Sequence, residues 1–263
     1  MKELKRLRCG EAICYKNINE YMIKNIKSIR ERFYPMTDTK VVVFDFDGTL
    51  TKTENNYTSW QLIWLYLGYS LDDCGRFYKK YVNQELSHQE WCDITAGYFI
   101  EKGLTVSDVE KISRQITLID GTISVIKKMK ERGVKVYICS GSIDTIIENV
   151  FGDEKSLFDG ISCNHFLYDR NQKLNLIKGT KFDFEGKAKY IKRIVDENRI
   201  SPTECLFVGN SDNDVWAYES GVKTLVVNPH KIMGMDRKVW RYYMEKMVDL
   251  HEILPYIFPL VEI

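Results

Sequence analysis

The 263-residue sequence lacks a net charge, a long apolar run and a paired cysteine motif. Its 38 Lys and Arg residues nearly balance 37 Asp and Glu residues, so the formal net charge is only +1. A charge this small gives no protein-wide field to attract nucleic acid or an anionic membrane. We therefore expect neither as a partner, and a small diffusible molecule fits better.

No run of about 18 apolar residues is present, and the charged N-terminus lacks the apolar stretch of a secretion signal. The seven cysteines are odd in number and include no CxxC pair, and Cys139 and Cys205 fall in predicted buried strands. We expect reduced thiols, no membrane span, no secretion signal and a cytoplasmic location.

Several signatures of catalysis and cofactor binding are also missing. The sequence has no GxGxxG, GxSxG or HExxH, and residues 186–188 lack the first glycine and the Ser or Thr of a P-loop. Residues 210–214 alternate polar side chains like the start of an EF-hand, but Val215 stands where that loop needs glycine. Four histidines without ligand spacing are interpreted as structural: His88, His165, His230 and His251.

One stretch, residues 40–51 with the sequence KVVVFDFDGTLT, concentrates the chemical signals. Residues 41–44 predict a strand buried on both faces, because β-branched and aromatic residues follow one another without alternation. Asp45 and Asp47 follow at its carboxyl end, where parallel α/β sheets bind ligands. Gly48 permits a tight turn there. A hairpin closed by an Asp-Gly turn is the alternative, and we disfavour it because no alternating partner strand follows.

Polar residues also follow two later predicted strands. Residues 134–139 end on Ser140-Gly141-Ser142, before a predicted helix over 143–150. A hydroxyl and main-chain amides at such a place suit phosphate binding, and an ordinary serine N-cap is the alternative. The polar side chains of residues 210–214 follow a strand over 205–208, and they are costly to bury unless they bind an ion.

The alternation of strands and helices from Gly121 onward predicts an α/β fold with a Rossmann-like, mostly parallel, five-stranded sheet. The predicted α/β core comprises residues 40–52 and 118–263. Its predicted strands are 41–44, 134–139, 161–166, 205–208 and 223–227, with a hairpin over 167–177, a helix over 187–198 and a terminal helix over 238–247.

Residues 53–117 are predicted to form an inserted helical cap. Three capping boxes mark helix starts, at Ser70 to Asp73, Ser87 to Glu90 and Thr105 to Asp108, and no strand pattern lies between them. Eleven aromatic residues fall in this segment, and most of them are expected to form its core.

Residues 1–39 are predicted to form an N-terminal helical extension. Apolar residues recur there every three or four positions and predict an amphipathic helix that ends before Pro35. We expect its apolar stripe to pack on the domain, and a membrane-surface or partner-binding helix is the alternative.

The stretch DFDGTLT, Asp45 to Thr51, resembles the first motif of the haloacid dehalogenase-like superfamily, DxDG(T/S)LT. Ser140 resembles the second motif, Lys187 the third, and residues 209–214 the fourth, GDxxxD, in the same order along the chain. The early helical insertion resembles the C1-type cap of the phosphoserine-phosphatase-like group. The resemblance therefore implies a core and cap arrangement with the active site between them.

The resemblance also implies Mg²⁺-dependent hydrolysis of a small phosphomonoester. Asp45 would be the nucleophile that forms an aspartyl-phosphate, Asp47 the general acid and base, and Lys187 the catalytic cation. An aspartate at position 47 favours phosphate esters, because dehalogenases and phosphonatases of the superfamily lack it. The implied phosphate ligands are Thr49, Ser140, Gly141 and Lys187, and the implied Mg²⁺ ligands are Asp45, the carbonyl of Asp47, Asn210 and, through water, Asp214.

Asn210 stands where the fourth motif usually has its first aspartate. Its amide oxygen can coordinate Mg²⁺ but brings no charge. Two alternatives to a phosphatase therefore stay open: a phosphotransferase or mutase on the same scaffold, and a catalytically impaired binding protein.

Five residues carry what the resemblance implies about the substrate. Glu54 matches a glutamate that holds the substrate ammonium, and Asn213 matches an asparagine placed near the substrate. Asn164 and Asp169 match an Asn and Asp pair in the family's hairpin. Asp93 falls near the place of an arginine that grips the substrate carboxylate. We therefore expect phosphoserine to be a poor substrate and esters such as phosphoethanolamine or phosphocholine to be preferred.

Overall fold

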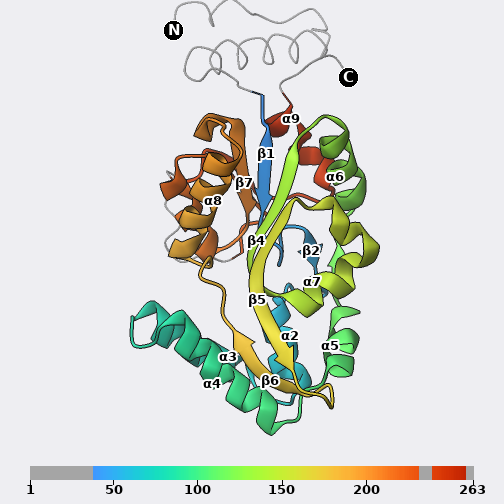
Figure 1. Cartoon of the computed structure of the whole chain (residues 1–263), viewed down its shortest axis with the longest axis vertical. Coiled ribbons are helices and arrows are strands. Elements are labelled where there is room, and N and C mark those ends of the chain that lie inside the picture. The colour runs from blue at the N-terminus through green and yellow to red at the C-terminus, as the bar shows by residue number, and fades with distance from the viewer. Residues whose placement is uncertain (1–37, 231–238, 259–263) are drawn as a thin grey trace, which may run out of the picture. The chain divides into compact units, whose positions relative to one another are not determined.

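The computed structural model describes residues 38–230 and 239–258 and contains a seven-stranded sheet. The strand order is β6-β5-β4-β1-β7-β8-β9 (Figure 1). The strands are β1 Val41–Phe44, β4 Lys135–Ile143, β5 Gly160–Tyr168, β6 Leu174–Lys178, β7 Cys205–Gly209, β8 Lys223–Val227 and β9 Tyr242–Met244. All neighbouring pairs are parallel except β5 and β6, which form an antiparallel hairpin.

The sheet confirms the predicted α/β class but has two strands more than the five we expected. The first, β6, is the second arm of the predicted hairpin, which continues the sheet beyond β5. The second, β9, replaces the predicted helix over residues 238–247, and that prediction is wrong within the residues described from 239 onward. Tyr242 and Tyr243 favour strands, and their pairing with β8 covers an open sheet edge.

Alternate residues of β1 pack against helices on opposite faces of the sheet. Val42 belongs to an apolar cluster with residues of α6 (Thr122–Glu131) and α7 (Asp144–Phe151), whereas Val41 and Val43 pack with residues of α8 (Glu185–Glu197). Figure 1 shows α8 on one side of the sheet and α6 and α7 on the other. This two-sided burial explains the continuous apolar run of the strand.

Helices α2 Ser59–Tyr66, α3 Leu71–Val82, α4 His88–Glu101 and α5 Val106–Ser113 make up the cap segment, between the short paired strands β2 Thr51–Lys52 and β3 Thr117–Leu118. The three predicted capping boxes are confirmed, and a fourth, from Thr58 to Gln61, starts α2. Trp64 is only 1% exposed, and its ring packs on Tyr69, Phe77, Tyr98 and Phe99. The expected aromatic core of the cap is therefore present.

The hairpin of β5 and β6 extends from the sheet to the cap (Figure 1). Main-chain hydrogen bonds join the two: Leu174 N–H donates to Leu104 at 2.8 Å, and Val106 N–H donates to Gln172 at 3.0 Å. Within the described residues, the remaining short helices are 3-10 turns at Gly152–Leu157, Pro202–Glu204, Asp212–Ser220 and Leu250–Ile253, followed by α9 Leu254–Ile257.

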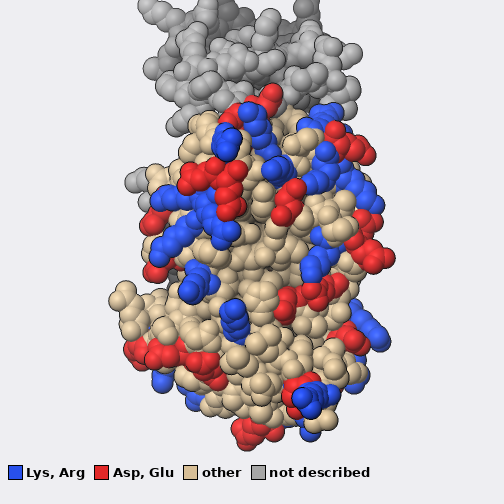
Figure 2. All heavy atoms as spheres, viewed as in Figure 1, with Lys and Arg blue, Asp and Glu red and all other residues tan. Residues whose placement is uncertain are grey.

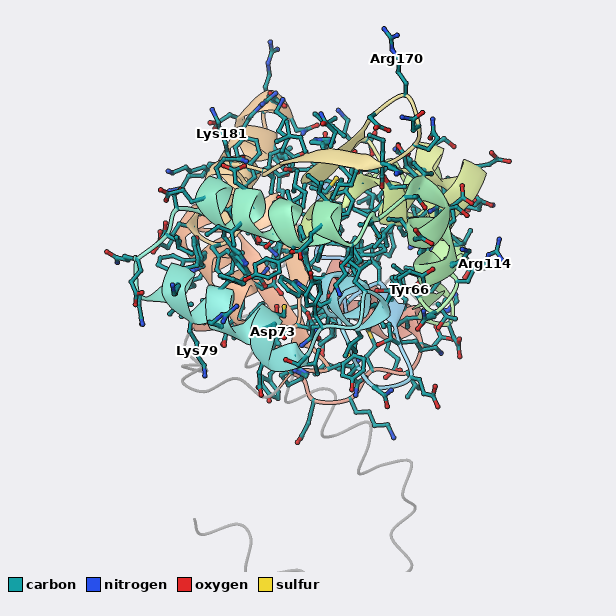
Figure 3. All side chains as sticks on the ribbon, turned by 90° about the horizontal axis from the view of Figure 1, so that it is seen from below. Tyr66, Asp73, Lys79, Arg114, Arg170 and Lys181 are labelled. Carbon is teal, nitrogen blue, oxygen red and sulfur yellow. The ribbon has the colours of Figure 1, made fainter. Side chains whose placement is uncertain are left out.

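Charged side chains of both signs are interspersed on the face shown in Figure 2. In the view onto the cap, the side chains of Lys79, Arg114 and Arg170 project outward (Figure 3). Within the described ranges, no helix is long and apolar enough to cross a membrane. The helix expected within the N-terminal extension lies outside the residues that the structure describes.

Candidate active site

Asp45 directly follows β1, which lies between β4 and β7 in the sheet. Its N–H donates to the carbonyl of Val208 in β7 at 2.9 Å. Its side chain is buried, with 3% of the residue exposed, and accepts a hydrogen bond from Lys187 Nζ at 2.9 Å. The expected nucleophile is therefore fixed by main-chain pairing on one side and by an ion pair on the other.

Lys187 joins two carboxylates from different strand ends. It lies in the first turn of α8, is fully buried, and donates to Asp45 at 2.9 Å and to Asp214 at 2.5 Å. Burial lowers the pKa of Lys187, but Asp214 and Asp45 outweigh this effect and hold the pKa well above its ordinary value. The lysine is therefore positively charged at neutral pH.

The same cluster carries more negative than positive charge. Burial, and after it the charge of Asp214, raise the pKa of Asp45 to about 7, although Lys187 opposes both. When both carboxylates are ionised, the single ammonium leaves a surplus negative charge in a buried place, which is costly unless a further cation joins them. The arrangement therefore suits a positively charged cofactor.

The turn after β7 brings Asn210 next to the first motif. The hydroxyl of Thr49 donates to Asn210 Oδ1 at 3.4 Å, and a Cβ at Gly48 would overlap the Asn210 carboxamide. Gly48 also has a φ of +77°, so glycine is required there for two reasons. The main-chain N–H groups of Asn210 and Ser211 donate to Asp214 Oδ2 at 2.9 and 3.0 Å, which orders the turn.

The residues expected to hold Mg²⁺ fit an oxygen-ligated cation. Among residues 38–230 and 239–258, no group of three or more His, Cys, Asp or Glu side chains forms a metal cluster. The expected set instead combines the Asp45 carboxylate with amide and carbonyl oxygens, and hard cations such as Mg²⁺ prefer oxygen. Both oxygens of Asp214 already accept hydrogen bonds, from Lys187 and from the N–H of Asn210.

The carboxylate of Asp47 is held by the first residue of α2, which the sequence analysis did not identify. Ser59 N–H donates to Asp47 Oδ1 at 3.1 Å, and Ser59 Oγ donates to Oδ2 at 2.7 Å. Burial raises the pKa of Asp47 to about 6, and the hydrogen bonds from Ser59 oppose the rise. The capping box from Thr58 to Gln61 was the signal that could have located this helix start.

The second motif lies in an irregular part of β4, which runs to Ile143 and so extends beyond the predicted end at residue 139. The pairing of β4 with β5 shifts register between Cys139 and Ile143. Within this irregular stretch, Ser142 N–H donates to Ser140 Oγ at 3.1 Å. Such bulges commonly re-aim side chains next to active sites.

The carbonyl of Gly141 is fixed from two directions. Trp60 Nε1 of the cap donates to it at 2.7 Å, and Asn164 Nδ2 of β5 donates to it at 2.6 Å. A Cβ at Gly141 would overlap the carboxylate of Asp183, so only glycine fits there without displacement. The implied phosphate-binding segment is therefore held by residues of both cap and core.

Asp183 links the cap to the fourth motif, and it was also missed in the sequence. It accepts a hydrogen bond from Asn213 Nδ2 at 2.9 Å, and its Oδ2 lies 3.7 Å from His88 Nε2 of α4. Burial lowers the pKa of His88, but hydrogen bonds with Asp183 and Cys92 outweigh it and raise the pKa to about 10. His88, expected to be structural, is thus a charged residue where the cap meets the core.

Three residues that the resemblance relates to the substrate have no described contact with this site. Glu54 is exposed in the segment after β2. Asp169 is exposed in the hairpin turn, where it accepts hydrogen bonds from the N–H groups of Asn171 and Lys173. Asp93 is exposed on α4 and accepts a hydrogen bond from Gln89 at 2.7 Å. The resemblance matched the acid of the family's hairpin to Asp169, which is exposed in the turn. The carboxylate next to Gly141 and Asn213 is that of Asp183.

Comparison with known proteins identifies the family of the chain. The family model for haloacid dehalogenase-like hydrolases matches residues 39–220. A phosphoserine phosphatase of Methanocaldococcus jannaschii is 24% identical over 218 residues, which cover 83% of this chain and 97% of that protein. A phosphoserine phosphatase of Archaeoglobus fulgidus is 26% identical over 132 residues, which span half of this chain and 38% of that protein.

Solved structures give the same fold. A phosphoserine phosphatase with a phospho-aspartyl intermediate analogue superposes with a TM-score of 0.66 at 23% identity, over 84% of this chain and all of that one. A substrate-bound phosphoserine phosphatase gives 0.67 at 22% identity, with the same coverage. The chain therefore belongs to the haloacid dehalogenase-like hydrolases and has the fold of their phosphoserine-phosphatase-like members.

Proposed function

We propose that the chain is a Mg²⁺-dependent phosphatase that hydrolyses a small phosphomonoester with Asp45 as the nucleophile. The observation that carries this proposal is the meeting of Asp45 and Asp214 on the buried ammonium of Lys187, beside the carboxylate of Asp47. Phosphoryl transfer depends mainly on positioning and charge neutralisation, and this cluster offers both.

The reaction proceeds in two steps. In the first, a carboxylate oxygen of Asp45 attacks phosphorus, the bond to the ester oxygen breaks, and Asp47 gives its proton to the departing alcohol. In the second, Asp47 takes a proton from water as the water oxygen attacks phosphorus, and the bond to Asp45 breaks. Inorganic phosphate leaves, and both carboxyl groups return to their starting states.

The other residues bind and neutralise. Thr49, Ser140 and Gly141 are the proposed phosphate ligands, and Lys187 keeps its charge next to the nucleophile. Mg²⁺ would be held by Asp45, the carbonyl of Asp47 and Asn210, with Asp214 acting through water. When bound, the ion supplies positive charge that offsets the negative charge of the phosphoryl oxygens.

The test is phosphate release from p-nitrophenyl phosphate with and without Mg²⁺. We expect turnover that requires the metal and is lost on its removal by EDTA. Transfer of the phosphoryl group to an added alcohol but not to water would instead support a phosphotransferase. Binding of phosphate esters without any turnover would support the impaired binding protein.

The preferred ester is a separate question. The expectation that phosphoserine is a poor substrate stays a prediction. Glu54 and Asp93 are exposed, and no described hydrogen bond joins either of them to the site, so their contacts do not support it. A panel of phosphoserine, phosphoethanolamine, phosphocholine and sugar phosphates tests it directly. A clear preference for phosphoserine, the substrate named for the relatives, would contradict the prediction.

A further inference from the structure

The start of α2 contacts two parts of the active site at once. Ser59, the first residue of the helix, is fully buried and binds both carboxylate oxygens of Asp47. The next residue, Trp60, donates to the carbonyl of Gly141 at 2.7 Å. One turn of a cap helix therefore meets both the expected general acid and the expected phosphate-binding segment.

The Ser59 hydroxyl lies between two polar side chains. Its single hydrogen goes to Asp47 Oδ2, at 2.7 Å. Ser59 Oγ also lies 2.9 Å from Ser142 Oγ, and by distance alone either hydroxyl could be the donor in this contact. The side chains of Ser142, Ser59 and Asp47 are therefore connected by hydrogen bonds, which join the second motif, the cap and the first motif.

The helix itself does not need the Ser59 hydroxyl. The N-cap of α2 is Thr58, whose side chain accepts from Gln61 N–H at 3.3 Å while the Gln61 side chain accepts from Thr58 N–H at 2.9 Å. That capping box already satisfies the helix start. A hydroxyl at position 59 is therefore free of a capping role, and its contacts are all with active-site segments.

We propose that Ser59 is a positioning residue for the phosphatase reaction, which holds the Asp47 carboxyl in the orientation that protonates the departing ester oxygen. This inference rests on the proposed function, because it assigns Asp47 as general acid. The two hydrogen bonds come from the cap, so the acid is correctly oriented only while α2 is seated on the core.

The test compares two esters that differ in their need for an acid. p-Nitrophenolate departs without a proton, whereas the alkoxide of an alkyl ester such as phosphoethanolamine must be protonated. The quantity measured is kcat/KM, which reports the steps up to formation of the phosphoryl-Asp45 enzyme. General acid catalysis is worth roughly 10²–10⁴-fold, so Ser59→Ala should lower kcat/KM for the alkyl ester about 10- to 100-fold. The p-nitrophenyl ester should be little affected.

Two further variants separate positioning from folding. Ser59→Thr keeps both the N–H and the hydroxyl, and it should restore alkyl-ester turnover relative to Ser59→Ala. Ser113→Ala removes another buried cap hydroxyl, which donates to Val109 at 2.8 Å, and it should leave the ratio of the two esters unchanged. Thermal unfolding of the alanine variants checks that both are folded.

The outcomes are distinct for the inference and for the proposed function. Equal losses on both esters in Ser59→Ala, or no loss on either, would overturn the positioning role while the phosphatase proposal remains. Turnover of neither ester by the wild-type protein would overturn the proposed function and this inference together.

Discussion

The core and the cap contribute to the site by different kinds of interaction. The core provides formal charges: Asp45, Asp214 and Lys187 meet in ion pairs of 2.9 and 2.5 Å, and all three are buried. The cap provides mainly neutral donors, the Ser59 hydroxyl and the Trp60 indole, with hydrogen bonds of 2.7 Å each. The charged contact that it makes with the described part of the core, His88 with Asp183, is longer at 3.7 Å.

This difference indicates which property of the site each region controls. Buried charges dominate the energetics of a site, because an unpaired one costs several kcal/mol. A neutral hydrogen bond contributes only about 1 kcal/mol, but it fixes orientation. The core therefore supplies the electrostatics of the reaction, and the cap supplies alignment and closure. Substitutions in the core should thus have larger effects than substitutions in the cap.

The largest effect is expected for Lys187→Met, which removes the cation that pairs both carboxylates. Leaving a buried charge without its partner typically costs about 3–5 kcal/mol, so the free energy of unfolding should fall by about that amount. Catalysis should be lost as well. Urea unfolding without Mg²⁺ measures the change. Lys189→Met on the exposed side of the same helix is the control and should stay within about 0.5 kcal/mol of wild type. Equal stabilities for both variants would contradict the view that the buried charges of the core dominate the energetics of the site.

The next effect, Asp45→Asn, should separate activity from stability within the core. The amide cannot attack phosphorus, so turnover should fall by more than roughly 10³-fold. Stability should change little, because Lys187 keeps Asp214 and one of two repelling carboxylates is removed. Steady-state turnover and thermal unfolding measure the two. Substantial Mg²⁺-dependent turnover in the variant would contradict the covalent mechanism.

A smaller effect is expected for Asn210→Asp, which restores the charge that this chain lacks at its fourth motif. A carboxylate here should bind Mg²⁺ more tightly, so the metal concentration that gives half-maximal turnover should fall. Titration of both proteins with Mg²⁺ measures the shift. If the midpoint is unchanged or higher, Asp212 or Asp214 already supplies the missing charge.

The same division explains which residues could be predicted from the sequence. Asp45, Asp47 and Lys187 each lie at the end or start of an element with a clear local pattern, so their meeting follows from the parallel sheet. Ser59 and Trp60 contact partners 12 and 81 residues away, and only the docking of the cap brings them there. No local pattern encodes such docking.

The errors in the fold have the same origin. Residues 242–244 have no strand partner nearby in sequence, and only the free edge of β8 makes them a strand instead of a helix. The substrate residues Glu54 and Asp93 were placed by spacing alone. Both are exposed, and the hydrogen bond described for Asp93 is with Gln89 on its own helix. Spacing is thus informative along a strand and its turn but not across a cap.

The smallest effect is expected from the cap's ionic contact, and it depends on pH. The pKa of His88 is about 10 in the folded protein, above the value of about 6.5 for an unfolded histidine. The contact should therefore stabilise fully below about pH 6.5, and its contribution should be lost as the pH rises through 10. His88→Gln should lower the free energy of unfolding by about 1 kcal/mol at pH 6 and by less at pH 9.

A double-mutant cycle with Asp183→Asn isolates this contact, since the asparagine can still accept the hydrogen bond from Asn213. The double variant should lose less than the sum of the single variants at pH 6, because each single change already removes the pair. At pH 9 the coupling should shrink. A coupling that is absent at pH 6, or equal at both pH values, would show that the cap joins the core through neutral contacts alone. Charged interactions at the site would then come only from the core.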